Sequence, residues 1–294
     1  MSLWTSIADN ISATTGAPFH CREQQAGSGG CINITSTVSD GERSYFVKLN
    51  RADLADMFEA EAAGLTEIAA CGAIRVPEVI CSGVSADQCY LVLEQLALGR
   101  GDCRSHERLG RDLAEMHRCY DDRYGWHRDN TIGSTPQHNQ PSDDWSGFWR
   151  EQRLGFQLEL AARNGHGRRL QQLGEQLLPN IEAFFAGHIP GAALLHGDLW
   201  SGNYSFLSDG TPVIYDPAVY YGDRETDLAM TELFGGFSPR FYSAYREHYP
   251  LDEGYRLRKA LYNLYHVLNH ANLFGGGYAS QAEHMMDALL SEVH

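Results

Sequence analysis

Two short stretches of this 294-residue chain carry oxygen-bearing side chains at a spacing suited to holding a metal ion beside a reacting hydroxyl group. The first stretch, LHGDLWSGN at 195–203, places Asp198 five positions before Asn203. The second stretch, IYDP, carries Asp216. Amide and carboxylate oxygens are hard ligands of the kind that Mg²⁺ binds. The pattern predicts that Asn203 and Asp216 hold the metal and that Asp198 faces the group bound to it.

A predicted hairpin brings these residues together. Residues 204–207 and 212–215 read as two short strands, joined by the turn sequence SDG at 208–210. The residue before the first strand and the residue after the second lie at the same open end, and these are Asn203 and Asp216. Asn and Asp are also common turn caps, which explains either residue taken singly. Asp198, Asn203 and Asp216 occur together, with His196 and Gly197 just before them, and this combination favours a metal site.

Nearby residues are predicted to hold the loop at 195–203 in place. A single His-x-Asp pair lacks the further ligands of a hydrolytic metal site, so His196 is predicted to pin the loop through hydrogen bonds. Asp227, in the first turn of a helix predicted over 225–233, is expected to brace the same loop. Trp200 either stacks on a substrate or packs in the interior, and the sequence leaves both alternatives open.

A second group of residues precedes these by about 150 positions. In the strand YFVKLN, alternation places Lys48 opposite the face formed by Tyr45, Val47 and Leu49. The apolar stripe of a helix predicted over 53–70 passes through Glu61, and a core-facing carboxylate is costly unless it is paired. We therefore predict a Lys48–Glu61 ion pair that directs the lysine to the phosphates of ATP. Glu59 and Glu67 are expected to be solvated.

The glycine stretch GSGG at 27–30 lies in the hairpin ahead of that strand. Its backbone N–H groups, above all those of Gly29 and Gly30, are predicted to close over the nucleotide phosphates.

The elements that must position these residues fall into two lobes. Strand patterns and one helix, at 53–70, fill residues 1–96, and helical patterns dominate 97–294, so we predict an α+β bilobal fold. The predicted strands are 19–25, 32–38, 43–50, 76–81 and 89–94. The predicted helices of the second lobe are 104–119, 145–163, 168–186, 225–233, 238–248 and 252–273.

Composition narrows the class of protein. A formal net charge of −15 argues against a nucleic-acid partner and would suit an amine-bearing substrate. The start of the chain lacks a secretory signal, and no apolar run is long enough to span a membrane. The seven cysteines show no CxxC pair or zinc spacing, which favours reduced thiols in the cytoplasm over a disulfide framework. The oligomeric state is left open.

With these residues in place, the chain resembles protein-kinase-like phosphotransferases, the branch that includes aminoglycoside and choline kinases. It is more similar still to the fructosamine kinase (ketosamine 3-kinase) family, over about residues 27–245. The segments that carry this likeness are GGCIN, YFVKLN, MFEAEAAGL, LVLEQL, IGSTPQHN, LLHGDLWSGN, DPAVYYGDRETDLAM and ELFGGFSPRFYSAY.

The resemblance implies ATP- and Mg²⁺-dependent phosphorylation of the 3-hydroxyl of ketosamines, the sugar adducts of free amines or protein lysines, as a deglycation repair activity. It further implies that Asp198 aligns the hydroxyl group and that the adenine bonds to the backbone between Glu94 and Leu96. The alternative is another small-molecule kinase of this fold, acting on an aminoglycoside, choline or a sugar. A catalytically dead binding module is disfavoured because the expected site residues are all present.

One position departs from the family pattern. Cys31 stands beside the glycine stretch where many bacterial members would carry Asp. A thiol there either makes the site sensitive to oxidation or is an inert small residue.

Overall fold

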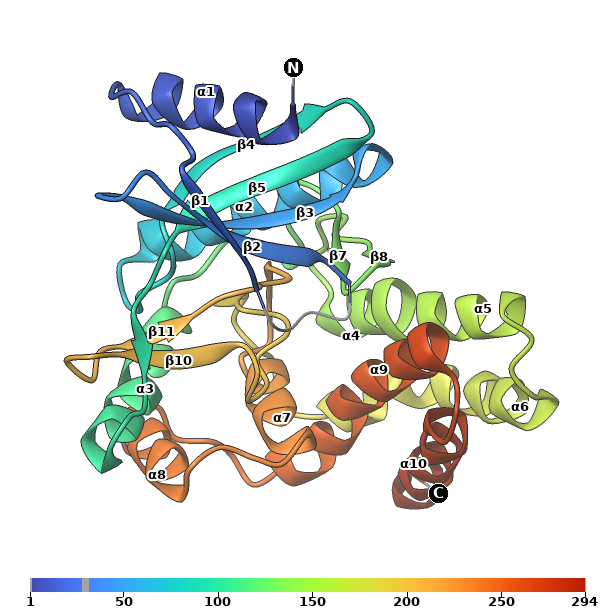
Figure 1. Ribbon diagram of the computed structural model, residues 1–294. Coiled ribbons are helices and arrows are strands. Elements are labelled where there is room, and N and C mark those ends of the chain that lie inside the picture. The colour runs from blue at the N-terminus through green and yellow to red at the C-terminus, as the bar shows by residue number, and fades with distance from the viewer. Residues whose placement is uncertain (1, 28–31, 294) are drawn as a thin grey trace.

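Alternating apolar residues near the N-terminus build the sheet of the first lobe. In the computed structural model, which describes residues 2–27 and 32–293, this sheet is antiparallel with the order β1-β2-β3-β5-β4 (Figure 1). Its strands are β1 (Glu23–Ala26), β2 (Ile34–Ser39), β3 (Ser44–Arg51), β4 (Val79–Ser85) and β5 (Gln88–Glu94). The predicted strands overlap all five, and the fourth begins three residues later than expected.

Helices cover both faces of this sheet (Figure 1). Helix α2 (Ala55–Cys71) follows a 3₁₀ turn, packs against β4 and β5, and ends at Gly72 in the left-handed conformation. On the other face, Val47 of β3 joins a core cluster with Ile7 and Ile11 of α1 (Leu3–Thr15). Helix α1 was not predicted, because its many Ser, Thr and Asn residues have modest helix propensity and its stability comes from packing on the sheet.

The second lobe is mostly helical, as predicted. Its helices are α3 (Cys103–Met116), α4 (Trp145–Phe148), α5 (Phe156–Arg163), α6 (Arg168–Leu177), α7 (Glu225–Leu233), α8 (Pro239–His248), α9 (Tyr255–Phe274) and α10 (Tyr278–Val293). A π-helical segment, Trp149–Gly155, joins α4 to α5, and the 3₁₀ segment Leu178–Phe185 continues α6. Helix α10 was not predicted. Within 2–27 and 32–293, no helix is long and apolar enough to cross a membrane.

Short strands hold the loops of the second lobe in place. The predicted hairpin is present as β10 (Tyr204–Leu207) and β11 (Pro212–Ile214), and β10 also pairs with β6 (Leu98–Gly99). Two further pairs were not predicted because each strand has only three residues. They are β7 (Asn130–Ile132) with β8 (Thr135–Gln137), and β9 (Ala193–Leu195) with β12 (Tyr220–Gly222).

The prediction that the cysteines are reduced is wrong for two of them. Cys71, the last residue of α2, forms a disulfide with Cys119, three residues beyond α3. The two positions are 48 apart in sequence, and only the packing of the lobes brings their Cα atoms to 6.3 Å. No local spacing pattern in the sequence predicts a disulfide between cysteines this far apart. The bridge joins a helix of the first lobe to the second lobe.

We expect loss of this disulfide, in Cys71→Ser or on reduction, to lower the free energy of unfolding by about 2–4 kcal/mol, because the bridge limits the freedom of the unfolded chain. Urea denaturation with and without dithiothreitol measures the change. Cys103→Ser is the control, since Cys103 is exposed and free. Equal stability of Cys71→Ser and Cys103→Ser would contradict the prediction.

Candidate active site

Lys48 of β3 lies between two carboxylates. Its side chain is buried, with the residue 4% exposed, and its Nζ lies 2.5 Å from Glu61 Oε1 and 2.6 Å from Asp216 Oδ1. The predicted Lys48–Glu61 pair is therefore present, and the pair also reaches a residue of the second lobe. Burial alone would lower the pKa of Lys48, but Asp216 and Glu61 outweigh it and raise that pKa. The lysine keeps its charge inside the protein.

Asp216 follows β11 at a sharp change of chain direction. Its φ of +59° lies in the left-handed region, which Asp tolerates better than most residues. This conformation ends the hairpin and leaves the carboxylate in contact with Lys48, with 47% of the side chain exposed. A carboxylate that is both held by a lysine and open to solvent can still accept a further ligand.

Asp198 and Asn203 are hydrogen-bonded to each other within the loop 195–203. Asn203 Nδ2 donates to the main-chain oxygen of Asp198 at 2.9 Å and to its Oδ2 at 3.3 Å. Burial, followed by the charges of Asp216 and Asp227, raises the pKa of Asp198 to about 7. A carboxyl group with a pKa in this range can accept a proton from a hydroxyl group near neutral pH.

The donor set fits a divalent cation. Because the amide nitrogen of Asn203 is directed at Asp198, its oxygen is the atom left to serve as a ligand, and Asp216 adds a carboxylate. Both are hard oxygen donors at the open end of one hairpin, where Tyr215 N donates to Asn203 O at 3.0 Å. Asn203 and Asp216 would hold Mg²⁺.

Asp227 of α7 fixes the backbone of the loop. Its two carboxylate oxygens accept from the main-chain N–H groups of His196 (2.7 Å) and Gly197 (2.8 Å). His196 Nδ1 accepts from Asp198 N at 3.2 Å, so Nε2 carries the proton and donates to Tyr215 O at 3.0 Å. Both residues thus make the supporting contacts that the sequence predicted. Burial lowers the pKa of His196, which keeps the ring neutral.

His117 is a supporting residue that was not predicted. Its Nε2 lies 3.2 Å from Asp227 Oδ2, and its Nδ1 lies 2.8 Å from the hydroxyl of Tyr245. It stands just beyond α3 without a recognisable motif, and its partners on α7 and α8 are 110 and 128 positions away in sequence.

Gly197 cannot be replaced without disturbing this geometry. Its φ is +82°, and an added Cβ would lie 2.0 Å from the main-chain oxygen of Ala218. We expect Gly197→Ala to cost at least about 2 kcal/mol more stability than Gly165→Ala, because Gly165 has a similar φ of +78° with open space around it. Thermal unfolding of both variants measures the difference. Equal melting temperatures would contradict the predicted clash.

The remaining predicted site residues are Trp200, Glu94, Leu96, Gly29 and Gly30. Trp200 is 38% exposed, which removes the alternative of interior packing. Glu94 ends β5, and its side chain pairs with Arg75 and accepts from Glu78 N at 3.1 Å. Leu96 lies in the connection between the lobes, where its oxygen accepts from Leu98 N. Gly29, Gly30 and Cys31 lie outside the described residues.

Two acidic residues near the site have defined partners. Glu67, predicted to be solvated, accepts a hydrogen bond from the hydroxyl of Tyr221 at 2.7 Å. Glu225 pairs with Arg258 through both oxygens, at 2.7 and 2.9 Å. Arg258 also pairs with Asp252, so the nearby group of His188, Glu225 and Asp252 is a neutralised ion-pair network. It needs no cation.

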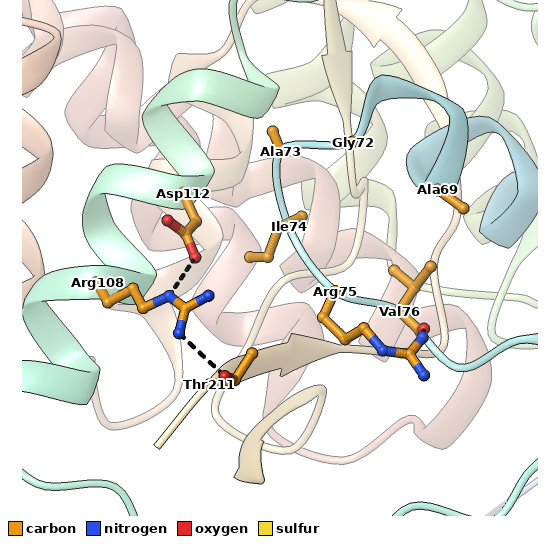
Figure 2. Close-up of a pocket in the computed structure, with 9 residues that line it drawn as sticks. All are labelled: Ala69, Gly72, Ala73, Ile74, Arg75, Val76, Arg108, Asp112 and Thr211. Carbon is orange, nitrogen blue, oxygen red and sulfur yellow. Dashed lines mark hydrogen bonds and ion pairs between the residues drawn. The ribbon is translucent and has the colours of Figure 1, made fainter. Parts of the chain in front are cut away.

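A cavity of about 420 Å³ has a lining that includes none of Lys48, Asp198, Asn203 and Asp216, and Figure 2 shows the residues that line it. Residues from the end of α2, the following loop, α3 and Thr211, which directly precedes β11, line it. Its charged groups all have partners: Arg108 pairs with Asp112 at 3.3 Å and donates to Thr211 at 2.9 Å, and Arg75 pairs with Glu94 outside the lining.

Comparison with known proteins decides the family. The fructosamine kinase family model matches residues 3–292. The chain belongs to the fructosamine kinase family. It is 51% identical to a Synechocystis sp. protein assigned as a ketoamine kinase, with 98% of this chain and 97% of that protein covered. It is also 43% identical to the chloroplastic protein-ribulosamine 3-kinase of Arabidopsis thaliana, with 89% and 81% covered.

Solved structures agree on the fold of this kinase. The crystal structure of a Haemophilus somnus protein assigned as a fructosamine-3-kinase superposes with a TM-score of 0.91 at 30% identity, covering 98% of this chain and 97% of that one. A choline kinase from Streptococcus pneumoniae gives a TM-score of 0.67 at 14% identity, with 98% of both chains covered. The predicted bilobal, protein-kinase-like α+β fold is confirmed.

Proposed function

We propose that this kinase transfers the γ-phosphoryl group of MgATP to the 3-hydroxyl of ketosamines. The observation that carries the proposal is Lys48, held between Glu61 and Asp216, opposite a loop that presents Asp198 and Asn203. Relatives that are 51% and 43% identical carry the names ketoamine kinase and protein-ribulosamine 3-kinase, which supports this class of substrate.

Each residue has a role that its surroundings support. Asp198 accepts a hydrogen bond from the substrate hydroxyl, aligns its oxygen with the phosphorus and takes the proton late. Lys48 places its charge against the phosphate oxygens, and Glu61 keeps it oriented. Asn203 and Asp216 hold the metal, which neutralises charge on the phosphates when bound. Catalysis by these residues is mainly positioning and electrostatics.

The surrounding regions complete the proposal. The adenine bonds to the backbone at Glu94–Leu96, and Gly29 and Gly30 cover the phosphates. This connection divides a nucleotide lobe, 1–96, from a catalytic lobe, 97–294. Trp200 stacks on the sugar or on the amine-bearing part of the substrate, and the acidity of the chain favours an amine. We place the activity in the cytoplasm, on free or protein-bound ketosamines.

A substrate panel tests the proposal. Ribulosamine, erythrulosamine and fructosamine adducts of lysine are compared with an aminoglycoside, choline and free sugars, with ADP release and ³¹P NMR of the product as readouts. We expect phosphorylation of the adducts at the 3-hydroxyl and none with Asp198→Asn. Faster turnover of choline, an aminoglycoside or a free sugar would assign the kinase to another substrate class.

A further inference from the structure

The β7–β8 hairpin directs two amide side chains at the segment that follows Asp216. Asn130 and Gln137 are cross-strand partners, so both side chains lie on the same face of the hairpin. Asn130 Nδ2 donates to the main-chain oxygen of Val219 at 2.7 Å, and Gln137 Nε2 donates to that of Ala218 at 3.1 Å. Both amide residues are buried. They hold two successive carbonyl groups that lie between β11 and β12.

The same segment is held from two other sides. Ala218 N donates to the main-chain oxygen of His196 at 2.8 Å, which joins it to the loop of Asp198. Helix α2 approaches closely at Gly64, where an added Cβ would lie 3.0 Å from Val219 Cγ2. Residues 217–219 are thus the place where the Glu61 helix, the Asp198 loop and the β7–β8 hairpin meet.

A buried network fixes the two amides. Tyr265 donates to Gln137 Oε1 at 2.7 Å, and Asn130 Oδ1 accepts from Gln137 and Asn139, each at 2.9 Å. Asn139 Oδ1 in turn accepts from Arg153 at 2.8 Å.

Arg153 anchors the far end of the network. It lies in the π-helical segment, fully buried, with its guanidinium 4.1 Å from the ring centre of Tyr220 and 4.6 Å from that of Phe148. The positive charge of Arg153 is stabilised by main-chain carbonyl oxygens, by the side-chain oxygen of Asn139 and by the rings of Tyr220 and Phe148. Neither amide can rotate away without leaving buried polar atoms without partners.

We infer that Asn130 and Gln137 are positioning residues for metal binding by Asp216. By holding the carbonyls of Ala218 and Val219, they set where the Asp216 carboxylate lies relative to Lys48 and Asn203. The inference rests on the proposed metal role of Asp216. Residues that orient metal ligands from outside the coordination sphere typically change metal affinity by about 10–100-fold when they are replaced.

Calorimetric titration of the full chain with ADP, with Mn²⁺ as the metal probe or with EDTA, tests the inference. Gln137→Met keeps the length of the side chain but removes its donors. We expect ADP affinity in the presence of Mn²⁺ to fall about tenfold and ADP affinity in EDTA to stay unchanged. Gln152→Met is the matched control, because Gln152 also bonds main-chain groups, those of Gln140, without contacting residues 216–220.

A second variant keeps the test decisive if Gln137→Met unfolds. Gln137→Glu retains the acceptor for Tyr265 and regains a donor only when the acid is protonated. Burial raises the pKa of a carboxyl group above its ordinary value, so the Mn²⁺-dependent ADP affinity of this variant, relative to the native chain, should fall as the pH rises and the acid ionises. Native affinity in both variants, or equal losses with Mn²⁺ and with EDTA, would overturn the inference. Because the readout is nucleotide binding, failure of the ketosamine panel would refute the substrate class and leave this result standing.

Discussion

Asp198→Asn is expected to lower kcat by at least about 10²-fold with little change in ATP binding, because the asparagine amide cannot accept the hydroxyl proton. The substitution preserves size and keeps an oxygen beside Asn203, so the loop should remain in place. Steady-state phosphorylation of a ribulosamine adduct measures kcat. Asp209→Asn, in the exposed turn of the same hairpin, is the control and should keep native turnover. Near-native kcat in Asp198→Asn would remove the proposed role.

The same variant should be more stable than the native chain at alkaline pH. The pKa of Asp198 rises from 3.8 to about 7 on folding, so the folded state binds more protons than the unfolded state between these values. The stabilisation from the neutral acid is complete below about pH 4 and is lost as the pH rises through 7. Asparagine cannot ionise. Because Asp198 is partly exposed, we expect a gain of about 1–2 kcal/mol at pH 8 and none at pH 4.

Lys48→Met should reduce both stability and turnover. It leaves the largely buried Glu61 carboxylate without its cation, and breaking a buried pair in this way costs about 3–5 kcal/mol. It also removes the charge proposed to meet the phosphates, so kcat should fall at least about 10²-fold. Urea denaturation and the phosphorylation assay measure the two effects separately.

A double variant distinguishes the two effects. Lys48→Met combined with Glu61→Gln removes both buried charges, so stability should recover while turnover does not. Lys259→Met is the control, because Lys259 pairs with Glu232 at 2.7 Å in a partly exposed setting and should cost about 1 kcal/mol or less. Recovery of turnover in the double variant would show that Lys48 serves only to balance Glu61.

Local spacing was sufficient to predict much of the site. The hairpin from Asn203 to Asp216 spans few residues, so its geometry follows from strand and turn patterns. The Lys48–Glu61 pair follows from one strand and the next helix, where a core-facing carboxylate requires a cation. These predictions needed only neighbouring elements.

Contacts between distant segments could not be predicted in this way. The Lys48–Asp216 ion pair joins positions 168 residues apart, and the Cys71–Cys119 bridge depends on how two helices end. The amides of Asn130 and Gln137 sit in three-residue strands that carry no periodic signal. The partners of His117 could not be predicted either, since a histidine at a helix end has many possible partners. Tertiary packing alone assigns these residues their partners.

The Cys71–Cys119 bridge restricts how the lobes can open. One corner of the first lobe stays at a fixed separation from the second, so nucleotide entry and product release must proceed by rotation about that point rather than by translation. Elements near α2 then travel least, and β1 and β2, on the sheet edge away from β4, travel furthest. Reduction would free that corner and allow the lobes to slide.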